Sequence, residues 1–423
     1  MIDYKVSIEK SGQRIVVGSL TGENSADTRF TYDAGYLSSE DAQAISVNLP
    51  LTGTAFSAEQ TRLYFEGLLP EGYIRMSLAD SMHFEQEDYV SLLHVLGCEC
   101  LGAIMISDEN EEYDASYEAL SKKQLSDFAK EGASKSIELV KKSRLSLAGA
   151  SGKAGLYYDE KKGKWYLPVG TAPSTHIVKQ SHVRLDALVL NEQLCMLTAK
   201  LCGIDVPSGF IVNTGSGLDD SVLFAAKRYD RVFAENPVYN KKLPVPLRLH
   251  QEDFAQALGI PTAAKYEMPG DNYIKKMFDL LRAQSSNPVE DIIRLWDRIV
   301  FNCLIGNADA HLKNYSLLYG SDLSAKRLAP AYDIVSTAIY ESSSPNLSVL
   351  IGSAKTLDEL KLKDFRDAAD MAGIGRKLAM DHVDTMIKKL PKALDEASQS
   401  LNAQGFSLAR RIAGRIKAKA RLI

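Results

Sequence analysis

Four polar residues lie between two apolar stretches of the chain near position 310. An apolar run ends at Gly306, the next segment carries Asp309, His311, Lys313 and Asn314, and the chain then becomes apolar again, as a strand would. Carboxylate and amide oxygens are ligands that Mg2+ prefers, and an aspartate can also accept a proton from a hydroxyl group. These residue types indicate a candidate site for metal-assisted or acid–base chemistry.

The spacing of these residues narrows the chemistry. Asp309 and Asn314 are five positions apart, the separation at which protein kinases place the aspartate that handles the substrate hydroxyl and the asparagine that holds a metal. Asp333 follows a predicted strand, where a kinase places its second metal-binding aspartate, although the usual Phe-Gly does not follow here. Three residues on two loops could supply the metal and the aligned hydroxyl that phosphoryl transfer needs. Loop solvation and turn formation are the alternative interpretation of the Asp–Asn pair.

The bulk composition limits the class of protein. A chain of 423 residues, 45% hydrophobic and 25% charged, is typical of a globular protein with two or three domains. The net charge of −4 excludes a globally basic nucleic-acid binder but not a local basic patch. Five scattered cysteines, without a C-x-x-C pair, argue against a disulfide framework or a zinc site and favour the cytoplasm. We find no apolar signal core and no stretch near 18 apolar residues, so neither export nor membrane spanning is expected.

Helices must position this loop. Asn287 is a predicted N-cap with Pro288 at the first helical position, and the helix that follows ends at Gly306 and delivers the loop. After Asp333 the pattern predicts further helices, over residues 357–372, 379–390 and 391–400.

A small-residue loop precedes a predicted hairpin in the middle of the chain. Its backbone N–H groups could approach phosphate oxygens, and Lys153 could add a positive charge. An ordinary glycine-rich turn is the alternative. The predicted phosphate-binding residues are Ala148, Gly149, Ala150, Ser151, Gly152 and Lys153.

A strand over residues 175–179 ends in Lys179, and a helix over 191–202 follows. In this order of elements Lys179 would contact phosphates and Glu192 would pair with it. Lys179 could instead protect a sheet edge, and Glu192 could stabilise a helix N-terminus. Two further strands, over 208–213 and 222–227, lead to a segment predicted to link two lobes and to contact adenine, which contains Lys227, Arg228 and Tyr229.

These residues together resemble the HipA-type serine/threonine kinases, the toxins of bacterial HipA–HipB type II toxin–antitoxin pairs. The resemblance covers nearly the whole chain. It differs from the usual pattern at Ser151-Gly152, where Gln is common, and at Lys227, where a member carries Glu. The matching motifs are Glu66 to Gly72 (EGLLPEG), Ser146 to Ala150 (SLAGA), Thr175 to Lys179 (THIVK), Arg248 to Asp253 with Lys265 to Glu267 (RLHQED and KYE), Leu304 to Asn314 (LIGNADAHLKN) and Pro330 to Ile334 (PAYDI).

The resemblance implies an α+β, two-lobed protein-kinase-like fold with an extra N-terminal subdomain. The expected boundaries are an N-terminal subdomain over 1–110, a polar connecting segment over 111–140, the small lobe over 141–231 and the helical large lobe over 232–423. It also implies ATP and Mg2+ as cofactors. The implied roles are Asp309 as catalytic base, Asn314 and Asp333 as metal ligands, Lys179, His311, Lys313 and Tyr332 as ATP contacts, and Ser146 as an autophosphorylation site that switches the enzyme off.

The resemblance further implies a HipB-like helix-turn-helix antitoxin that binds operator DNA, with the kinase as corepressor. Targets known in the family include aminoacyl-tRNA synthetases. A catalytically weak, DNA-tethered corepressor and a small-molecule kinase are the alternatives. The C-terminal segment 408–423 is interpreted as a solvated helix or as a phosphate-backbone contact, because it carries Arg410, Arg411, Arg415, Lys417, Lys419 and Arg421 without an acid.

Overall fold

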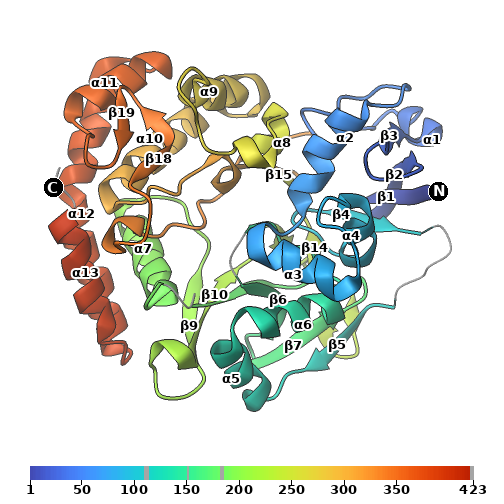
Figure 1. Ribbon diagram of the computed structural model, residues 1–423, viewed down its shortest axis with the longest axis horizontal. Helices are drawn as coiled ribbons and strands as arrows, with labels where there is room; N and C mark the ends of the chain where they lie inside the picture. The colour runs from blue at the N-terminus through green and yellow to red at the C-terminus, as the bar shows by residue number, and fades with distance from the viewer. Residues whose placement is uncertain (109–113, 150–151, 182–184, 420–423) are drawn as a thin grey trace. The chain divides into compact units, whose positions relative to one another are not determined.

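The computed structural model describes residues 1–108, 114–149, 152–181 and 185–419 of the chain (Figure 1). The chain forms two compact units. The first unit consists of residues 1–182, 225–262 and 317–326, and the second consists of 183–224, 263–316 and 327–423. Each unit is therefore assembled from segments that are far apart in the sequence.

The first unit begins with a four-stranded sheet in the order β3-β2-β1-β4. Strands β1 and β2 form a hairpin joined at Ser11 and Gly12, and both residues have positive φ, the backbone that a tight hairpin turn requires. Helices α1 to α4 accompany this sheet. The bounds are β1 Ile2–Lys10, β2 Gln13–Gly22, β3 Arg29–Tyr32, β4 Ile104–Ser107, α1 Ala34–Leu37, α2 Ala58–Phe65, α3 Gly72–Met82 and α4 Tyr89–Leu96.

A second sheet of the first unit carries the candidate phosphate-binding lysines. Strands β5, β7, β6, β8 and β10 are neighbours in that order. Helix α5 begins with a capping box formed by Ser121 and Gln124, and α6 packs on the sheet. The bounds are β5 Ser116–Ala119, α5 Lys122–Glu131, α6 Ala133–Ser143, β6 Lys153–Asp159, β7 Lys164–Val169, β8 His176–Gln180 and β10 Val222–Lys227. Residues 111–140, expected to be a polar connection, thus contain β5, α5 and most of α6; the proposed domain boundaries themselves stay a prediction.

Short elements complete the first unit after β10. Strands β11 and β14 pair, as do β12 and β13, and β15 lies beside β16 in a three-stranded sheet with β17. The bounds are β11 Arg231–Val232, β12 Tyr239–Asn240, β13 Leu243–Pro244, β14 Leu247–Arg248, β15 Gln251–Asp253, α8 Phe254–Leu258, β16 Ser316–Tyr319 and β17 Lys326–Leu328, of which the last two residues belong to the second unit.

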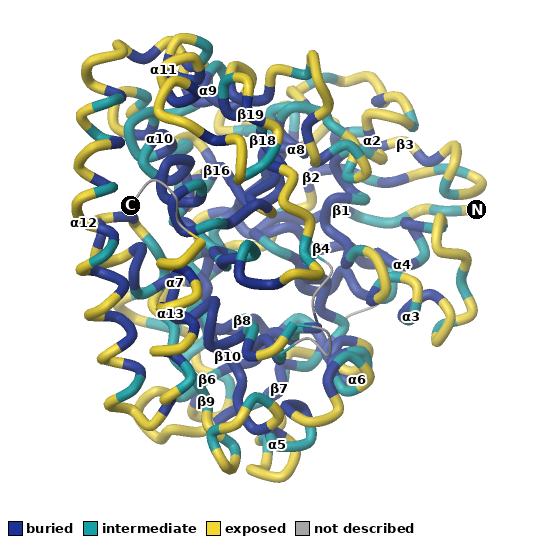
Figure 2. Tube along the Cα trace, turned by 60° about the vertical axis from the view of Figure 1, so that its left-hand side comes forward, coloured by how far each residue is buried: buried dark blue, intermediate teal, exposed yellow. Residues whose placement is uncertain are grey.

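The second unit is mainly helical. Helix α12 packs against α7, α10, α11 and α13, and the alternation of buried and exposed residues along α12 and α13 is visible in Figure 2. The buried Trp296 of α10 donates a hydrogen bond from Nε1 to the Ala379 carbonyl of α12 at 3.1 Å. The bounds are α7 Leu188–Cys202, β9 Gly209–Asn213, α9 Tyr273–Gln284, α10 Pro288–Ile305, β18 Asn346–Ile351, β19 Ala354–Thr356, α11 Leu362–Met371, α12 Arg376–Ala403 and α13 Leu408–Lys419.

Two predictions about helices are corrected. The expected pair of helices over 379–390 and 391–400 is one continuous helix, α12, with Pro391 in its interior. Burial of Leu390, Leu394 and Ala397 on the packed face of α12 offsets the backbone hydrogen bond that a proline removes. Helix α7 also begins earlier than expected, which places Glu192 in its second turn rather than its first. Within the described residues, no helix is both long enough and apolar enough to cross a membrane.

A buried carboxyl group fixes part of the first unit. Glu252 of β15 accepts hydrogen bonds from the Ser46 hydroxyl at 2.6 Å, from the Val47 amide at 3.0 Å and from the Tyr319 hydroxyl. Burial raises the pKa of Glu252 to about 7, although these hydrogen bonds act in the opposite direction. The folded protein therefore holds this proton at pH values where the unfolded chain has released it.

Glu252 predicts a loss of stability with rising pH. Because its folded pKa lies above the unfolded value, its contribution is fully present below about pH 4.5 and is lost as pH rises through about 7. The expected loss is on the order of 3 kcal/mol, from about 1.4 kcal/mol for each pKa unit. Urea unfolding at pH 5 and pH 8 should show that the free energy of unfolding of Glu252→Gln depends less on pH than that of the wild type. Glu235→Gln, at an exposed position of the same unit, should follow the wild type; equal slopes for all three proteins would contradict the assignment.

Candidate active site

Helix α10 ends abruptly at the loop that carries Asp309. Asn287 caps its N-terminus, as predicted, and Gly306 ends it with a φ of 77° in the left-handed region. A Cβ atom on Gly306 would lie 2.8 Å from the Cβ of Ala338. The Gly306 carbonyl accepts hydrogen bonds from the Ala338 amide at 2.9 Å and from the Thr337 hydroxyl at 3.2 Å. Glycine is therefore required here both for backbone conformation and for close packing.

Side-chain hydrogen bonds hold the start of this loop. The Asn307 side chain donates from Nδ2 to Oδ1 of Asn302 at 3.0 Å, and its Oδ1 accepts from the Asp309 backbone N–H at 3.1 Å. The Ala308 N–H donates to the Thr337 hydroxyl at 2.9 Å. The Asp309 side chain is exposed while its neighbours Ala308 and Ala310 are buried. A rigid backbone thus presents one solvent-accessible carboxylate.

Asp309 and Asn314 belong to one hydrogen-bonded turn. The Asn314 side chain donates from Nδ2 to the Asp309 carbonyl at 2.8 Å, and the His311 N–H donates to the same carbonyl at 2.9 Å. The Asn314 N–H donates in turn to the His311 carbonyl at 2.9 Å, and a single 3-10 turn covers Leu312–Asn314. Nδ2 of Asn314 is used within the loop, and its Oδ1 is an oxygen acceptor of the type that a metal can bind.

Asp333 lies on the neighbouring loop in a sparsely populated conformation. Its φ is 57°, a left-handed value that Asp tolerates better than most residues and that occurs often at functional sites. The preceding residue ties the two loops together, since the Tyr332 hydroxyl donates to the Lys313 carbonyl at 2.9 Å and lies 2.6 Å from the Ser316 hydroxyl. The Asn314 amide oxygen and the Asp333 carboxylate are hard oxygen donors of the type that Mg2+ prefers.

The candidate phosphate-binding lysines lie in the first unit. Lys153 of β6 and Lys179 of β8 are directly opposite each other in an antiparallel pair, so both side chains leave the same face of the sheet. Lys153 approaches the loop closely, because a Cβ on Gly149 would lie 2.6 Å from Nζ of Lys153, and Gly149 has a φ of 101°. The predicted contacts at Ala150 and Ser151 lie outside the described residues.

The Glu66–Gly72 segment holds the small-residue loop, a link that the sequence did not reveal. The Ser146 hydroxyl is fully buried and donates to the Leu68 carbonyl at 2.6 Å. Gly149 forms an isolated β-bridge with Pro70, and the Gly149 carbonyl accepts a hydrogen bond from the Glu71 N–H at 3.1 Å. The two motifs are adjacent in space although far apart in the chain.

A buried ion network lies beside this loop. Glu99, whose carbonyl accepts from the Ser146 N–H at 2.8 Å, pairs through Oε1 with Arg228 at 3.4 Å and with Arg231 at 2.9 Å. Arg228 also pairs with Asp230 at 2.7 Å. Burial alone would raise the pKa of Glu99, but Arg231 and Arg228 outweigh it and hold that pKa below its ordinary value. Sequence reasoning missed Glu99 as their partner.

This network gives the predicted adenine-binding segment a structural role as well. The Arg228 guanidinium is committed to the buried ion pairs, so a nucleotide contact at this position would involve the backbone. Lys227 pairs with Glu160 at 2.9 Å on the surface, and the Tyr229 hydroxyl donates to Gln251. Their contacts with ATP stay predictions. The ion pair between Lys179 and Glu192 also stays a prediction, because the two residues lie in different units.

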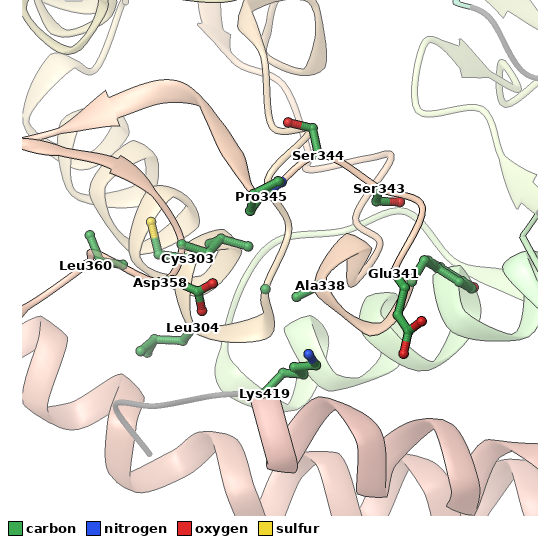
Figure 3. A pocket seen from close by; sticks show the side chains of 13 residues that line it. Cys303, Leu304, Ala338, Glu341, Ser343, Ser344, Pro345, Asp358, Leu360 and Lys419 are labelled. Atoms are coloured by element: carbon green, nitrogen blue, oxygen red, sulfur yellow. The ribbon is translucent and has the colours of Figure 1, made fainter.

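A pocket of about 230 Å³ lies behind the loop in the second unit, where α10 ends (Figure 3). Lys419 of α13 and Cys303 of α10 reach it from different elements. It does not include Asp309, Asn314 or Asp333, and so it is distinct from the candidate active site. Other lining residues include Leu304, Gly306, Ala338, Tyr340 and Glu341.

Comparison with known proteins identifies the family of this chain. A family model described as "HipA-like C-terminal domain" matches residues 145–394, and one described as "HipA N-terminal domain" matches residues 11–107. The chain belongs to the HipA family. The first match contains every candidate catalytic and nucleotide-binding residue, and the second contains the Glu66–Gly72 segment.

Relatives of the HipA family match this protein over most of its length. The protein Y4mE of Sinorhizobium fredii is 32% identical over 95% of this chain and 96% of its own. The serine/threonine-protein kinase toxin HipA of Shewanella oneidensis is 29% identical over 90% of this chain and 87% of its own. The fold matches a Shewanella oneidensis structure of HipA, HipB and operator DNA with a TM-score of 0.78, at 23% identity and over 98% and 96% of the two chains. The predicted family and the α+β kinase-like fold are therefore confirmed.

The contribution of Gly306 to stability can be tested by comparison with Gly203, a matched glycine at the end of another helix. Gly203 ends α7 with the same left-handed conformation, but a Cβ there would meet nothing within 4 Å. We expect Gly203→Ala to lower the free energy of unfolding by about 1 kcal/mol and Gly306→Ala by roughly twice as much or more, because the clash with Ala338 adds to the backbone strain. Adding Ala338→Gly should recover part of the loss in Gly306→Ala alone. Equal losses at the two glycines in urea unfolding would show that the contact with Ala338 carries no energy.

Proposed function

We propose that this HipA-family protein is an ATP-dependent serine/threonine protein kinase. The observation that carries the proposal is the single turn in which Asn314 bonds the Asp309 carbonyl, tied through Lys313 and Tyr332 to the loop of Asp333. Phosphoryl transfer depends on positioning and charge neutralisation more than on covalent chemistry, and these loops supply both kinds of group. In this proposal the expected domain boundaries place the nucleotide-binding small lobe at 141–231.

Each residue of the site has one role in this mechanism. Asp309, exposed on a fixed loop, orients the acceptor hydroxyl and accepts its proton. Asn314 Oδ1 and the Asp333 carboxylate would hold Mg2+, which would supply charge neutralisation at the phosphates of ATP. Lys153 and Lys179, on one face of the β6–β8 pair, would bind phosphates as point charges. His311, Lys313 and Tyr332 complete the nucleotide contacts.

The protein is proposed to act in the cytoplasm as the toxin of a toxin–antitoxin pair. An aminoacyl-tRNA synthetase is the proposed target. Growth arrest, or persistence, is the proposed outcome. A helix-turn-helix antitoxin and operator DNA are the proposed partners, supported by the HipA–HipB–DNA complex of the structural relative. The DNA contact is assigned mainly to the antitoxin, because α13 uses much of its charge locally. Arg411 pairs with Asp186 at 3.2 Å and Lys417 with Asp395 at 2.6 Å, while Arg415 donates to the Ile339 carbonyl. Arg421 lies outside the described residues.

Asp309→Asn tests the kinase assignment. The substitution keeps the size of the side chain but removes the proton acceptor, so nucleotide binding and thermal stability should persist while transfer falls on the order of a thousandfold or more. The measurement is incorporation of label from ATP into protein, followed by identification of the phosphorylated amino acid. Transfer at the wild-type rate by the purified variant would rule out Asp309 as the base. Asp322→Asn, at an exposed turn of the first unit, is the control and should be fully active.

Ser146 is proposed as the site of self-inhibition. Its hydroxyl is buried against the Leu68 carbonyl, so the loop must leave the Glu66–Gly72 segment before the hydroxyl can accept a phosphate. A phosphate of roughly −1.5 to −2 charge could not return against a carbonyl oxygen, and the loop would stay displaced from the nucleotide.

Mass spectrometry of protein incubated with Mg-ATP should find phosphate on Ser146 in the wild type and none in Asp309→Asn. The phosphorylated form should bind ATP at least tenfold more weakly than the unmodified form. Equal ATP affinity of the two forms would show that this loop does not control the site.

A further inference from the structure

A tyrosine from a separate segment contacts the candidate base. The Tyr266 hydroxyl donates to Oδ1 of Asp309 at 3.0 Å. Tyr266 lies on the connection between α8 and α9, outside the 304–314 motif, and nothing above assigns it a function. It is 46% exposed, so burial in the core does not explain its position.

The segment around Tyr266 is fixed on both sides. The Lys265 carbonyl accepts from the Leu312 N–H of the catalytic loop at 3.4 Å. Glu267 donates its backbone N–H to the Ser348 carbonyl at 2.9 Å, and its carboxylate accepts from the Tyr273 N–H at 2.9 Å. The Ser348 hydroxyl in turn donates to the Ala308 carbonyl at 2.6 Å. The backbone that carries Tyr266 is therefore joined to the residues on either side of Asp309.

Side-chain contacts also fix the tyrosine ring. It meets the His311 ring edge to face, with 5.3 Å between centroids and 78° between planes, and the Lys265 ammonium lies 5.2 Å from its centroid. Both partners are buried. A ring held by its backbone and by two neighbours is suited to a permanent contact rather than to displacement by an arriving substrate.

We propose that Tyr266 is a positioning residue that sets the orientation of the Asp309 carboxylate. This inference rests on the proposed function for its kinetic part. By donating to Oδ1, the phenol fixes the plane of the carboxylate and directs Oδ2 towards the acceptor hydroxyl.

Tyr266→Phe separates this role from structural support, because it retains the ring against His311 and Lys265 and removes the hydroxyl alone. We expect kcat to fall about tenfold with an unchanged KM for the protein substrate, because a misoriented carboxylate impairs the transfer step and not substrate binding. Tyr239→Phe, at a tyrosine of the first unit that is 63% exposed, is the matched control and should behave as the wild type.

A readout without catalysis keeps the proposal testable on its own. Crystal structures should show the Asp309 carboxylate in one orientation in the wild type and in Tyr239→Phe, and in a rotated or a second orientation in Tyr266→Phe. A wild type that transfers no phosphate would refute the proposed function but leave this comparison to decide the role of Tyr266. An unchanged Asp309 carboxylate in Tyr266→Phe, a higher kcat/KM in that variant, or phosphate found on Tyr266 would each overturn the inference, the last two by showing a blocking group or an acceptor.

Discussion

The candidate active site depends on how helix α10 ends. Gly306 takes a left-handed conformation that leaves no room for a side chain, and its carbonyl accepts hydrogen bonds from Thr337 and Ala338. That contact joins the start of the Asp309 loop to the segment that follows Asp333. The loops of Asn314 and Asp333 are thus fixed to each other at the helix terminus and again through Tyr332, so the proposed metal site would need little reorganisation before a metal binds.

The small-residue loop of the first unit is held in a different way. Its hydrogen-bond partners come from the Glu66–Gly72 segment and from Glu99, and Glu99 is itself held by buried arginines. Removing one member of such a network leaves an uncompensated charge, so it fixes geometry more than it adds net stability. This arrangement explains why Ser146, a residue expected to be phosphorylated, is inaccessible while the loop is in place.

Local patterns in the sequence predicted much of this structure. The N-cap at Asn287, the end of α10 at Gly306 and the strand ending near Lys179 follow from residue types that favour those backbone states, and the structure contains all three elements. The predicted break at Pro391 was wrong, because packing of α12 outweighs a local preference. The Glu99 network, the contact between Ser146 and Leu68 and the bond from Tyr266 to Asp309 join segments distant in sequence, and no local pattern could have paired them. The roles of the site residues stay proposals.

We propose that the loops of Asn314 and Asp333 hold the metal that accompanies ATP. Titration calorimetry of ATP binding to the wild type and to Asp333→Asn, with Mg2+ and with a chelator, is the decisive measurement. Mg2+ should strengthen ATP binding by the wild type several-fold or more, and Asp333→Asn should bind ATP equally weakly in both conditions. An Asp333→Asn variant that folds normally and retains the full effect of Mg2+ would show that Asp333 does not hold the metal.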